Sequence, residues 1–365
     1  MAALEVGWAD PRRLYAEARQ ARRLLDQARE VIAGGLGVRT PEVSFLPSGP
    51  VALRGAVEGI RYAGRRRGAR AVASAVEHSA VLVPARHHAA LAMDPELLAE
   101  VGVDVTGRLD LGAWEVAARV PGTVVAALQC ANGEVGTRQP LAAAHEQCRR
   151  HGIPLVVDAM SALGRDPVPE DYDVLVGEAR SWGGPGGVGV LVVPERTRWR
   201  RPGAGSELEH GRSDVEPMVP LVLAAAEAWR QTDAVHEADA QQARELVERV
   251  RVAAGRVPDT VVVGDPEDRL PHVTTFSCLF VDGEALVHEL DRRGFGVASG
   301  SACTASTLEP SHVLVAMGVL THGNVRVTIP LAATSPQREA GVDAFCAALP
   351  EAVATVRAHL GTERL

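Results

Sequence analysis

Three polar residues follow short apolar runs of the kind that form β-strands. Asp158 ends the run "PLVVDAM", His78 comes shortly after "ARAVAS", and Asn132 follows "VVAALQC". Ligands in open α/β sheets bind at the carboxyl ends of the strands, so the three side chains could line one crevice. Each also has a purely structural interpretation. Asp158 could cap a helix, His78 could be a hydrogen-bonded structural residue, and Asn132 is ambiguous by itself.

A fourth motif places Cys303 in the run "VASGSACTASTLEPSHVL", which is rich in small polar residues. Such a run cannot bury a thiol well, and an exposed loop gives a reactive thiol access to its partners. A structural, buried cysteine would normally have apolar neighbours. We therefore expect Cys303 to be functional.

The composition limits the chemistry that is available to these residues. The five cysteines are widely spaced and form no CxxC pair, which argues against a disulfide framework and a zinc site. All 38 basic residues are arginine, so the chain contains no lysine. Codon bias toward arginine is one explanation. Arginine nevertheless cannot form the Schiff bases that the titratable amine of lysine forms.

Charge and hydropathy indicate the environment of the protein. The formal net charge of -8 disfavours a nucleic-acid partner, and we expect the local run "GRRRGAR" to cap the exposed end of a helix rather than to bind phosphate. No window approaches the roughly 18 apolar residues of a membrane span, and the N-terminus lacks the apolar region of a secretion signal. We expect a cytoplasmic protein without a membrane partner.

The elements that must position these residues alternate between strands and helices. Apolar spacings of three and four predict an amphipathic helix over 11–35, with Leu14, Ala18, Ala21, Leu25, Ala28 and Ile32 on its buried face. Strand-like runs separated by helical patterns follow, which predicts an α/β fold with a mostly parallel sheet. A long helical run over 220–254 predicts a bridge to a second unit. We predict a large α/β domain over 1–240 and a small α+β domain over 241–365, with a strand-like segment "FGVASG".

Together and in this order, the motifs resemble those of the cysteine desulfurases, the NifS-like proteins of the class V aminotransferase superfamily. The resemblance runs from about Arg12 to Pro330 and includes "FLPSGP", "VEHSAVL", "ANGEVG", "VDAMSALG", "GGPGGVG", "RSDVEP", "SGSACTASTLEPSHVLVAMG" and "HGNVRV". One of these motifs alone would be weak evidence for the family, but several in the same order and register make the resemblance specific. The resemblance implies the pyridoxal phosphate (PLP)-dependent transferase fold of the aspartate aminotransferase type, with a mostly parallel large-domain sheet.

The resemblance also implies roles for individual residues. In that family a lysine holds PLP as a Schiff base, an aspartate pairs with the pyridine nitrogen, and a histidine stacks on the ring. Asp158 and His78 match the last two. Cys303 matches the thiol that attacks the cysteine–cofactor adduct and takes its sulfur as a persulfide. Arg326 in "NVRV" matches the arginine that clamps the substrate carboxylate, and Asn132 is assigned to the same substrate site.

The sequence departs from the family at the lysine itself. Aligning "GPGG" over 184–187 puts Ser181 where the lysine belongs and Arg180 where its preceding histidine stands. Serine cannot form an aldimine. Because the chain has no lysine, neither a neighbouring residue nor the second subunit of a homodimer can substitute. Arg180 is the one change whose charge could compensate, so both residues remain candidate contacts of the cofactor.

Other contacts of the cofactor differ as well. Val51 and Val215 replace two phosphate-binding threonines, Ser161 replaces a glutamine, Gly133 replaces an asparagine, and Glu178 replaces a phosphate-facing serine. A carboxylate at that place would repel a dianion. Each lost hydrogen bond to a charged phosphate costs roughly 1.5–3 kcal/mol, which weakens binding by orders of magnitude. We therefore expect a degraded site with no covalently bound PLP.

Three hypotheses about function follow. The first is a cysteine desulfurase-like pseudoenzyme that accepts or relays sulfur as a Cys303 persulfide. The second is a non-catalytic scaffold or regulator of a sulfur-carrier or desulfurase partner, in which Cys303 is incidental. The third is an enzyme that binds PLP or pyridoxamine phosphate (PMP) non-covalently through His78, Asp158 and Arg180. The resemblance implies a homodimer in every case.

Overall fold

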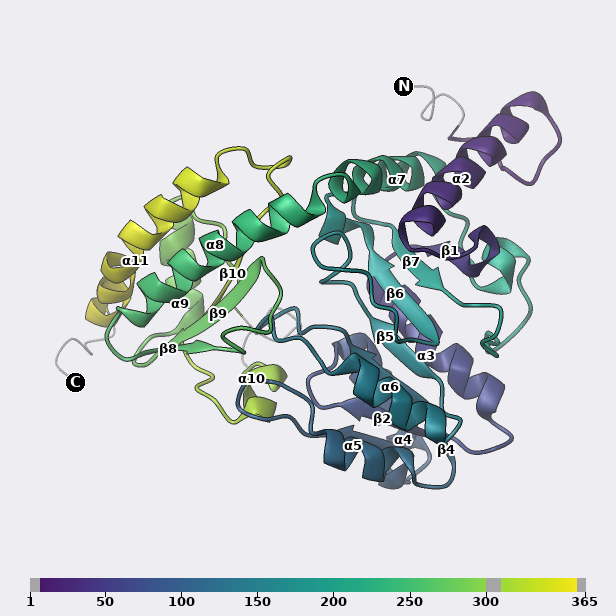
Figure 1. The fold of residues 1–365 in the computed structure, drawn as a ribbon, viewed down its shortest axis with the longest axis horizontal. Coiled ribbons are helices and arrows are strands. Elements are labelled where there is room, and N and C mark those ends of the chain that lie inside the picture. The colour runs from purple at the N-terminus through teal and green to yellow at the C-terminus, as the bar shows by residue number, and fades with distance from the viewer. Residues whose placement is uncertain (1–6, 300–309, 360–365) are drawn as a thin grey trace.

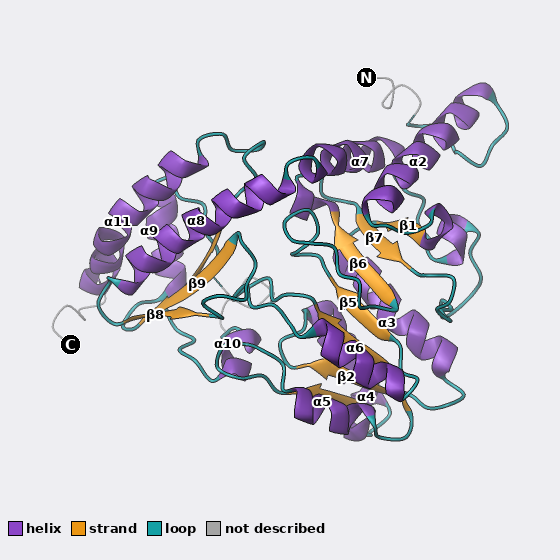
Figure 2. Ribbon diagram, in the orientation of Figure 1, coloured by secondary structure: helices purple, strands orange, loops and turns teal. Residues whose placement is uncertain are grey.

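The computed structural model describes residues 7–299 and 310–359. Figure 1 shows a larger part built around a wide sheet and, beside it, a smaller part that contains the last helices. Figure 2 shows that helices cover the strands in both parts. Within the described ranges, no helix combines the length and apolar character that a membrane crossing needs.

The large sheet has seven strands in the order β1-β7-β6-β5-β4-β2-β3. Five of them, β2 to β6, pair in parallel with one another, whereas β7 runs antiparallel to both of its neighbours. The predicted α/β fold with a mostly parallel sheet is confirmed. The strands are β1 (Val43–Leu46), β2 (Arg70–Ser74), β3 (Leu98–Val101), β4 (Thr123–Gln129), β5 (Leu155–Asp158), β6 (Val174–Glu178) and β7 (Gly189–Val192).

Helices pack on both faces of this sheet, which is why its strands read as continuous apolar runs. Successive residues of β5 enter different cores: Leu155 and Val157 face one, and Val156 faces the other. Helices α3 (Gly49–Gly64) and α4 (Ser79–Leu91) cover the face of Val156. The opposite face is covered by α2 (Ala16–Gly35), α5 (Leu111–Ala118), α6 (Leu141–Arg150) and α7 (Val219–Asp233). The described ranges also contain short 3-10 helices at η1 (Thr40–Glu42), η2 (Pro95–Leu97), η3 (Ala179–Trp182) and η4 (Leu208–Gly211).

Helix α2 confirms the predicted amphipathic helix except at its start. The five later positions of the predicted face are buried: Ala18, Ala21, Leu25, Ala28 and Ile32. Leu14 is 85% exposed, because the helix begins only at Ala16 and Leu14 lies outside its first turn. The spacing of apolar residues extends back to Leu14, but the backbone becomes helical only at Ala16.

The predicted single helix over 220–254 is wrong, because two helices share that run. Helix α7 ends at Asp233, and α8 (His236–Gly255) begins after Val235, whose φ of -130° is not helical. Neither a proline nor a glycine marks the break in the sequence. Figure 1 shows α7 over the large part, with α8 continuing into the small part. The predicted domain division at residue 240 falls inside α8 and stays a prediction.

The small part packs helices against an antiparallel sheet of order β10-β9-β8. Its core joins side chains of β9, β10, α8, α9 and α11. Its elements are β8 (Thr260–Val263), β9 (Val273–Cys278), α9 (Gly283–Arg292), α10 (His312–Met317), β10 (Asn324–Thr328) and α11 (Arg338–His359). The segment "FGVASG" is not a regular strand, since as far as it is described it pairs only at Ala298, opposite Arg326.

Candidate functional site

A cleft of about 220 Å³ opens at the carboxyl ends of β2, β4, β5 and β6, where they face α10 and β10. Four residues predicted from the sequence line it together, namely His78, Asn132, Asp158 and Arg326. The three strand-end side chains that were predicted to share a crevice therefore do share one. Arg180 and Ser181 are not among its lining residues, and Cys303 lies outside the described residues.

His78 stands at the start of α4 and faces the cleft. Its Nδ1 accepts a hydrogen bond from the backbone N–H of Ala80 at 3.0 Å, which caps the helix. Since Nδ1 accepts, the neutral ring carries its proton on Nε2. Burial and the neighbouring His312 lower the pKa of His78, so the ring is uncharged at neutral pH. The structural and the ligand-facing interpretations of this histidine are thus compatible.

Asp158 ends β5 and begins a turn rather than a helix. Its Oδ1 accepts a hydrogen bond from the backbone N–H of Met160 at 2.8 Å. Burial raises the pKa of Asp158 to about 7; the Met160 hydrogen bond opposes that rise, and the nearby Glu178 adds to it. Part of the Asp158 population is therefore protonated at neutral pH. A cation held beside the carboxylate would instead lower its pKa and keep it ionised.

Two further carboxyl groups in the cleft were not predicted as site residues. Glu77 is fully buried, and its Oε1 accepts from the backbone N–H of Gln129 at 2.8 Å while Oε2 has no partner among the described residues. Burial, together with the negative charge of Asp158, raises the pKa of Glu77 to about 8. Burial likewise raises the pKa of Glu134 to about 7, against the effects of Ser311 and Arg326. The cleft thus holds several acids that are protonated near neutral pH.

Asn132 organises the loop after β4. Its Oδ1 accepts from the backbone N–H groups of Glu134 and Val135 at 2.8 and 2.9 Å, and its Nδ2 donates to the carbonyl of Val76 at 3.2 Å. These bonds occupy most of the amide's capacity. Asn132 therefore shapes the wall of the cleft, and its predicted part in substrate binding stays a prediction.

Arg326 on β10 supplies a donor to the cleft from the small part. Its Nη1 lies 3.5 Å from the carbonyl of Gly133, and its buried Nε has no hydrogen-bond partner within the described ranges. An unpaired buried donor is costly unless a ligand or water meets it. The arrangement suits an anionic group, and the predicted role of Arg326 in clamping a substrate carboxylate stays a prediction.

His312 is a cleft residue that the sequence prediction missed. It begins α10, and its Nε2 donates to the carbonyl of Glu77 at 2.9 Å. A small core holds α10 in place by packing Val313 and Leu314 against Val76 and Val135. The only sequence signal was its place in "EPSHVL", next to the cysteine motif.

The glycine corner after β6 keeps its backbone geometry without a lysine. The Ser181 hydroxyl lies 2.8 Å from the carbonyl of Leu163 and 3.0 Å from that of Glu178, so its proton is used within the corner. Gly183 ends η3 at a φ of +79°, a conformation that suits glycine. Arg180 is exposed, and its guanidinium lies over Gly186, whose Cβ, if present, would meet Arg180 Nη2 at 2.5 Å.

The first turn of α3 is covered by side chains of the cleft. A Cβ on Gly49 would lie 2.4 Å from Met160 Sδ and 2.9 Å from Glu178 Cβ. Ser48 caps the helix by accepting from the backbone N–H of Val51 at 3.4 Å. A helix N-terminus ordinarily suits a phosphate, but here a thioether and a carboxylate-bearing chain stand above it.

The four described cysteines are poor nucleophiles. Burial raises the pKa of each thiol, to about 12 for Cys148 and well above its usual value for Cys130; Cys278 and Cys346 shift in the same direction. Because the thiolate is the reactive form, none of these four suits sulfur exchange at neutral pH.

The sheet order, the antiparallel seventh strand and the cleft at the strand ends define an α/β protein of the PLP-dependent transferase fold. A model of the family described as aminotransferase class-V matches residues 8–343. The chain therefore belongs to the class-V aminotransferase family, for which PLP is the implied cofactor. The predicted resemblance to cysteine desulfurases is confirmed by its relatives.

A cysteine desulfurase of Cereibacter sphaeroides is 30% identical over 358 residues, covering 96% of this chain and 90% of the relative. The cysteine desulfurase IscS of Dictyoglomus turgidum is 29% identical over 338 residues, covering 91% of this chain and 85% of the relative. Among solved structures, a NifS-like protein superposes with a TM-score of 0.84 at 22% identity over 97% of this chain and 95% of that one, which shows the shared fold. DndA from Streptomyces lividans superposes with a TM-score of 0.73 at 26% identity, over 90% of this chain and 94% of that one.

Proposed function

We propose that this protein is a cysteine desulfurase-like sulfur carrier that accepts or relays sulfur as a persulfide on Cys303, without covalently bound PLP. The observation that carries the proposal is Ser181 at the position of the family's lysine, in a chain that has no lysine. Retention of the cysteine motif beside this loss favours sulfur handling over general decay.

The residues of the cleft do not fit a firmly held PLP. Met160 and Glu178 pack against Gly49 in the first turn of α3, and Glu178 also lines the cleft, which brings an acidic side chain beside the expected place of the phosphate. Asp158 keeps the place from which an aspartate pairs with the pyridine nitrogen, so the misfit lies at the lysine and the phosphate contacts. Arg180, which could have compensated, lies over Gly186 outside the cleft. We therefore derive no chemical step through PLP.

Persulfide transfer needs only thiol chemistry. The Cys303 thiolate attacks the outer sulfur of a donor persulfide, the donor's S–S bond breaks, and the donor leaves as a thiolate with the electron pair. The outer sulfur keeps its proton and is now bonded to Cys303. A thiolate of an acceptor then repeats the step on that sulfur, so no external oxidant or reductant is consumed. The four described cysteines, with their raised pKa values, do not compete for this role.

The setting of the protein is part of the same proposal. Free thiols and persulfides persist in a reducing compartment, which supports a cytoplasmic location. The family relationship supports a homodimer, with a sulfur-carrier protein or a true desulfurase as the exchange partner. A scaffold role without chemistry would leave the cellular function intact in a Cys303→Ser variant.

The loss of cofactor binding is tested by titration of the full-length protein with PLP and, separately, with PMP. We expect no saturable heat and no bound-cofactor absorbance band up to millimolar ligand, because the lysine and two phosphate donors are missing. A lysine-bearing cysteine desulfurase serves as the positive control. Micromolar binding that disappears in Asp158→Asn, which keeps the acceptor for the Met160 N–H, would instead make this a lysine-free cofactor enzyme.

A further inference from the structure

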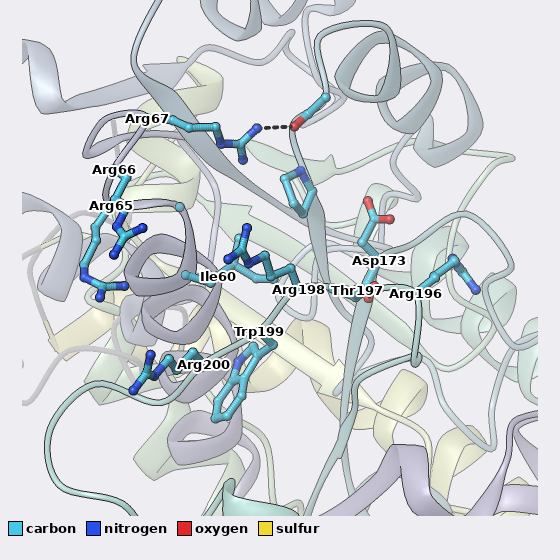
Figure 3. Close-up of a pocket in the computed structure, with 14 residues that line it drawn as sticks. Ile60, Arg65, Arg66, Arg67, Asp173, Arg196, Thr197, Arg198, Trp199 and Arg200 are labelled. Carbon is cyan, nitrogen blue, oxygen red and sulfur yellow. Dashed lines mark hydrogen bonds between the residues drawn. The ribbon is translucent and has the colours of Figure 1, made fainter.

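A second hollow, of about 650 Å³, lies at the opposite end of the large sheet from the cleft. It is formed by the loop after α3, the turn before β5 and the segment that follows β7. Figure 3 shows arginine side chains around it, with Arg198 between the loop after α3 and Asp173. Six arginines line the hollow: Arg65, Arg66, Arg67, Arg196, Arg198 and Arg200.

These six charges are not taken up in ion pairs, although Arg196 helps to lower the pKa of the nearby Asp173. None of the six forms an ion pair with a carboxylate of the described residues. The one acidic residue of the lining, Asp173, is engaged by His145 at 3.3 Å and by the backbone N–H of Leu155 at 2.9 Å. Like charges within a Debye length of about 10 Å repel one another, so the hollow favours an anion. The concentration is notable in a chain whose net charge is -8.

Several of the guanidinium groups are held in place before any ligand arrives. Arg65 stacks on the ring of Tyr62, 4.1 Å from its centroid, and donates to the Tyr62 carbonyl at 2.7 Å. This contact caps the end of α3, as predicted for "GRRRGAR". Arg67 donates to the carbonyl of Gly152 at 3.2 Å, and Arg196 to that of Tyr172 at 3.1 Å. Carbonyl partners orient these side chains but leave their charge free.

The segment that carries the other arginines is also anchored. The Trp199 indole lies against α3, where a Cβ on Gly59 would meet its Nε1 at 2.0 Å, and it donates to the carbonyl of Gly55 at 3.2 Å. Thr197 Oγ1 donates to the carbonyl of Asp173 at 2.8 Å. Arg198 and Arg200 stand on either side of the half-buried Trp199. Such an anchored wall reduces the entropy that binding would cost.

We propose that this hollow binds a small polyphosphate, a molecule with two or more linked phosphate groups. Guanidinium groups pair with phosphate oxygens through two parallel N–H donors, and six of them around one hollow match several phosphates at once. The volume lies within the roughly 300–1,000 Å³ of small-molecule sites. A nucleic-acid surface would require a basic stripe along the molecule, whereas these arginines surround one hollow.

The test is calorimetry of the full-length protein with pyrophosphate, tripolyphosphate and ATP. The informative variant is Arg66→Ala/Arg198→Ala, because neither side chain makes a hydrogen bond or ion pair that the described fold uses. We expect one saturable site for tripolyphosphate and at least about a 100-fold loss of affinity in this variant. ATP that binds more tightly than tripolyphosphate would identify a nucleotide; equal affinities would identify the phosphates alone as the recognised group.

The matched control is Arg23→Ala/Arg256→Ala, which removes the same charge from two exposed sites away from the hollow. It should leave the affinity unchanged. Three results would overturn the proposal: no saturable binding of any of these ligands, equal losses in both double variants, or tighter binding of an oligonucleotide or a polyglutamate peptide than of tripolyphosphate. The thermal stability of each variant is measured alongside to verify folding.

Discussion

Glu77→Gln should make the protein more stable in mildly alkaline solution and flatten its dependence of stability on pH. The folded-state pKa of Glu77 is raised from 4.5 to about 8, mainly by burial. A carboxyl group whose pKa is higher in the folded than in the unfolded protein contributes to stability. That contribution is fully present below the unfolded pKa of 4.5 and is lost as the pH rises to the folded pKa of about 8. Each such group lowers the free energy of unfolding by up to about 1.4 kcal/mol per pH unit across that window. The neutral amide removes this slope.

The measurement is chemical denaturation of wild type and variant at several pH values between 4.5 and 8. Asp158 and Glu134, whose pKa values are raised to about 7, keep a residual slope in the variant. The exposed Glu30 on α2 provides a matched control, since Glu30→Gln should not change the slope. An unchanged slope in Glu77→Gln would show that this carboxyl is ionised in the folded protein.

Glu209→Ala should destabilise the protein by about 3–5 kcal/mol, the usual cost of leaving one charge of a buried ion pair without its partner. The Glu209 side chain is 3% exposed and accepts from Arg29 Nη1 and Nη2 at 2.7 and 2.8 Å. It also accepts from the backbone N–H of Phe45 at 2.6 Å. The pair ties the loop of η4 to α2 and β1, next to the large core.

Two variants isolate the effect of the unpaired charge. Residue 209 has a φ of +48°, and alanine meets the same backbone strain as glutamate, so the difference reports the side chain. The double variant Arg29→Ala/Glu209→Ala should recover part of the loss. Glu195→Ala, which breaks the exposed pair with Arg39, should change stability far less. Equal effects of Glu209→Ala and Glu195→Ala would refute the buried-pair explanation.

Much of the fold was predictable because local signals and tertiary structure agree. The β-branched runs became buried strands, and parallel strands bring their carboxyl ends to one edge, so His78, Asn132 and Asp158 meet there. Arg326 comes from the small part, about 170 residues further along the chain than Asp158, and only the family resemblance placed it in the same cleft. Pattern arguments on a single strand cannot find such a partner.

The remaining features depend on packing that no local pattern encodes. The raised pKa of Glu77 arises from complete burial beneath α10, which the sequence does not indicate at position 77. The break between α7 and α8 at Val235 has no proline or glycine to mark it. The side chain of Arg180 lies over Gly186, because the glycine leaves room there, and this turns it away from the cleft.

Persulfide transfer to Cys303 is tested by exposing the reduced, full-length protein to glutathione persulfide without PLP and locating any added sulfur by mass spectrometry. We predict the gain of one sulfur atom at Cys303, its loss in Cys303→Ser, and its retention in Cys346→Ser, which alters the half-buried described thiol. L-cysteine with PLP should add none. No gain from the persulfide would contradict persulfide transfer and favour a scaffold, and a gain that requires L-cysteine and PLP would contradict it and favour a cofactor enzyme.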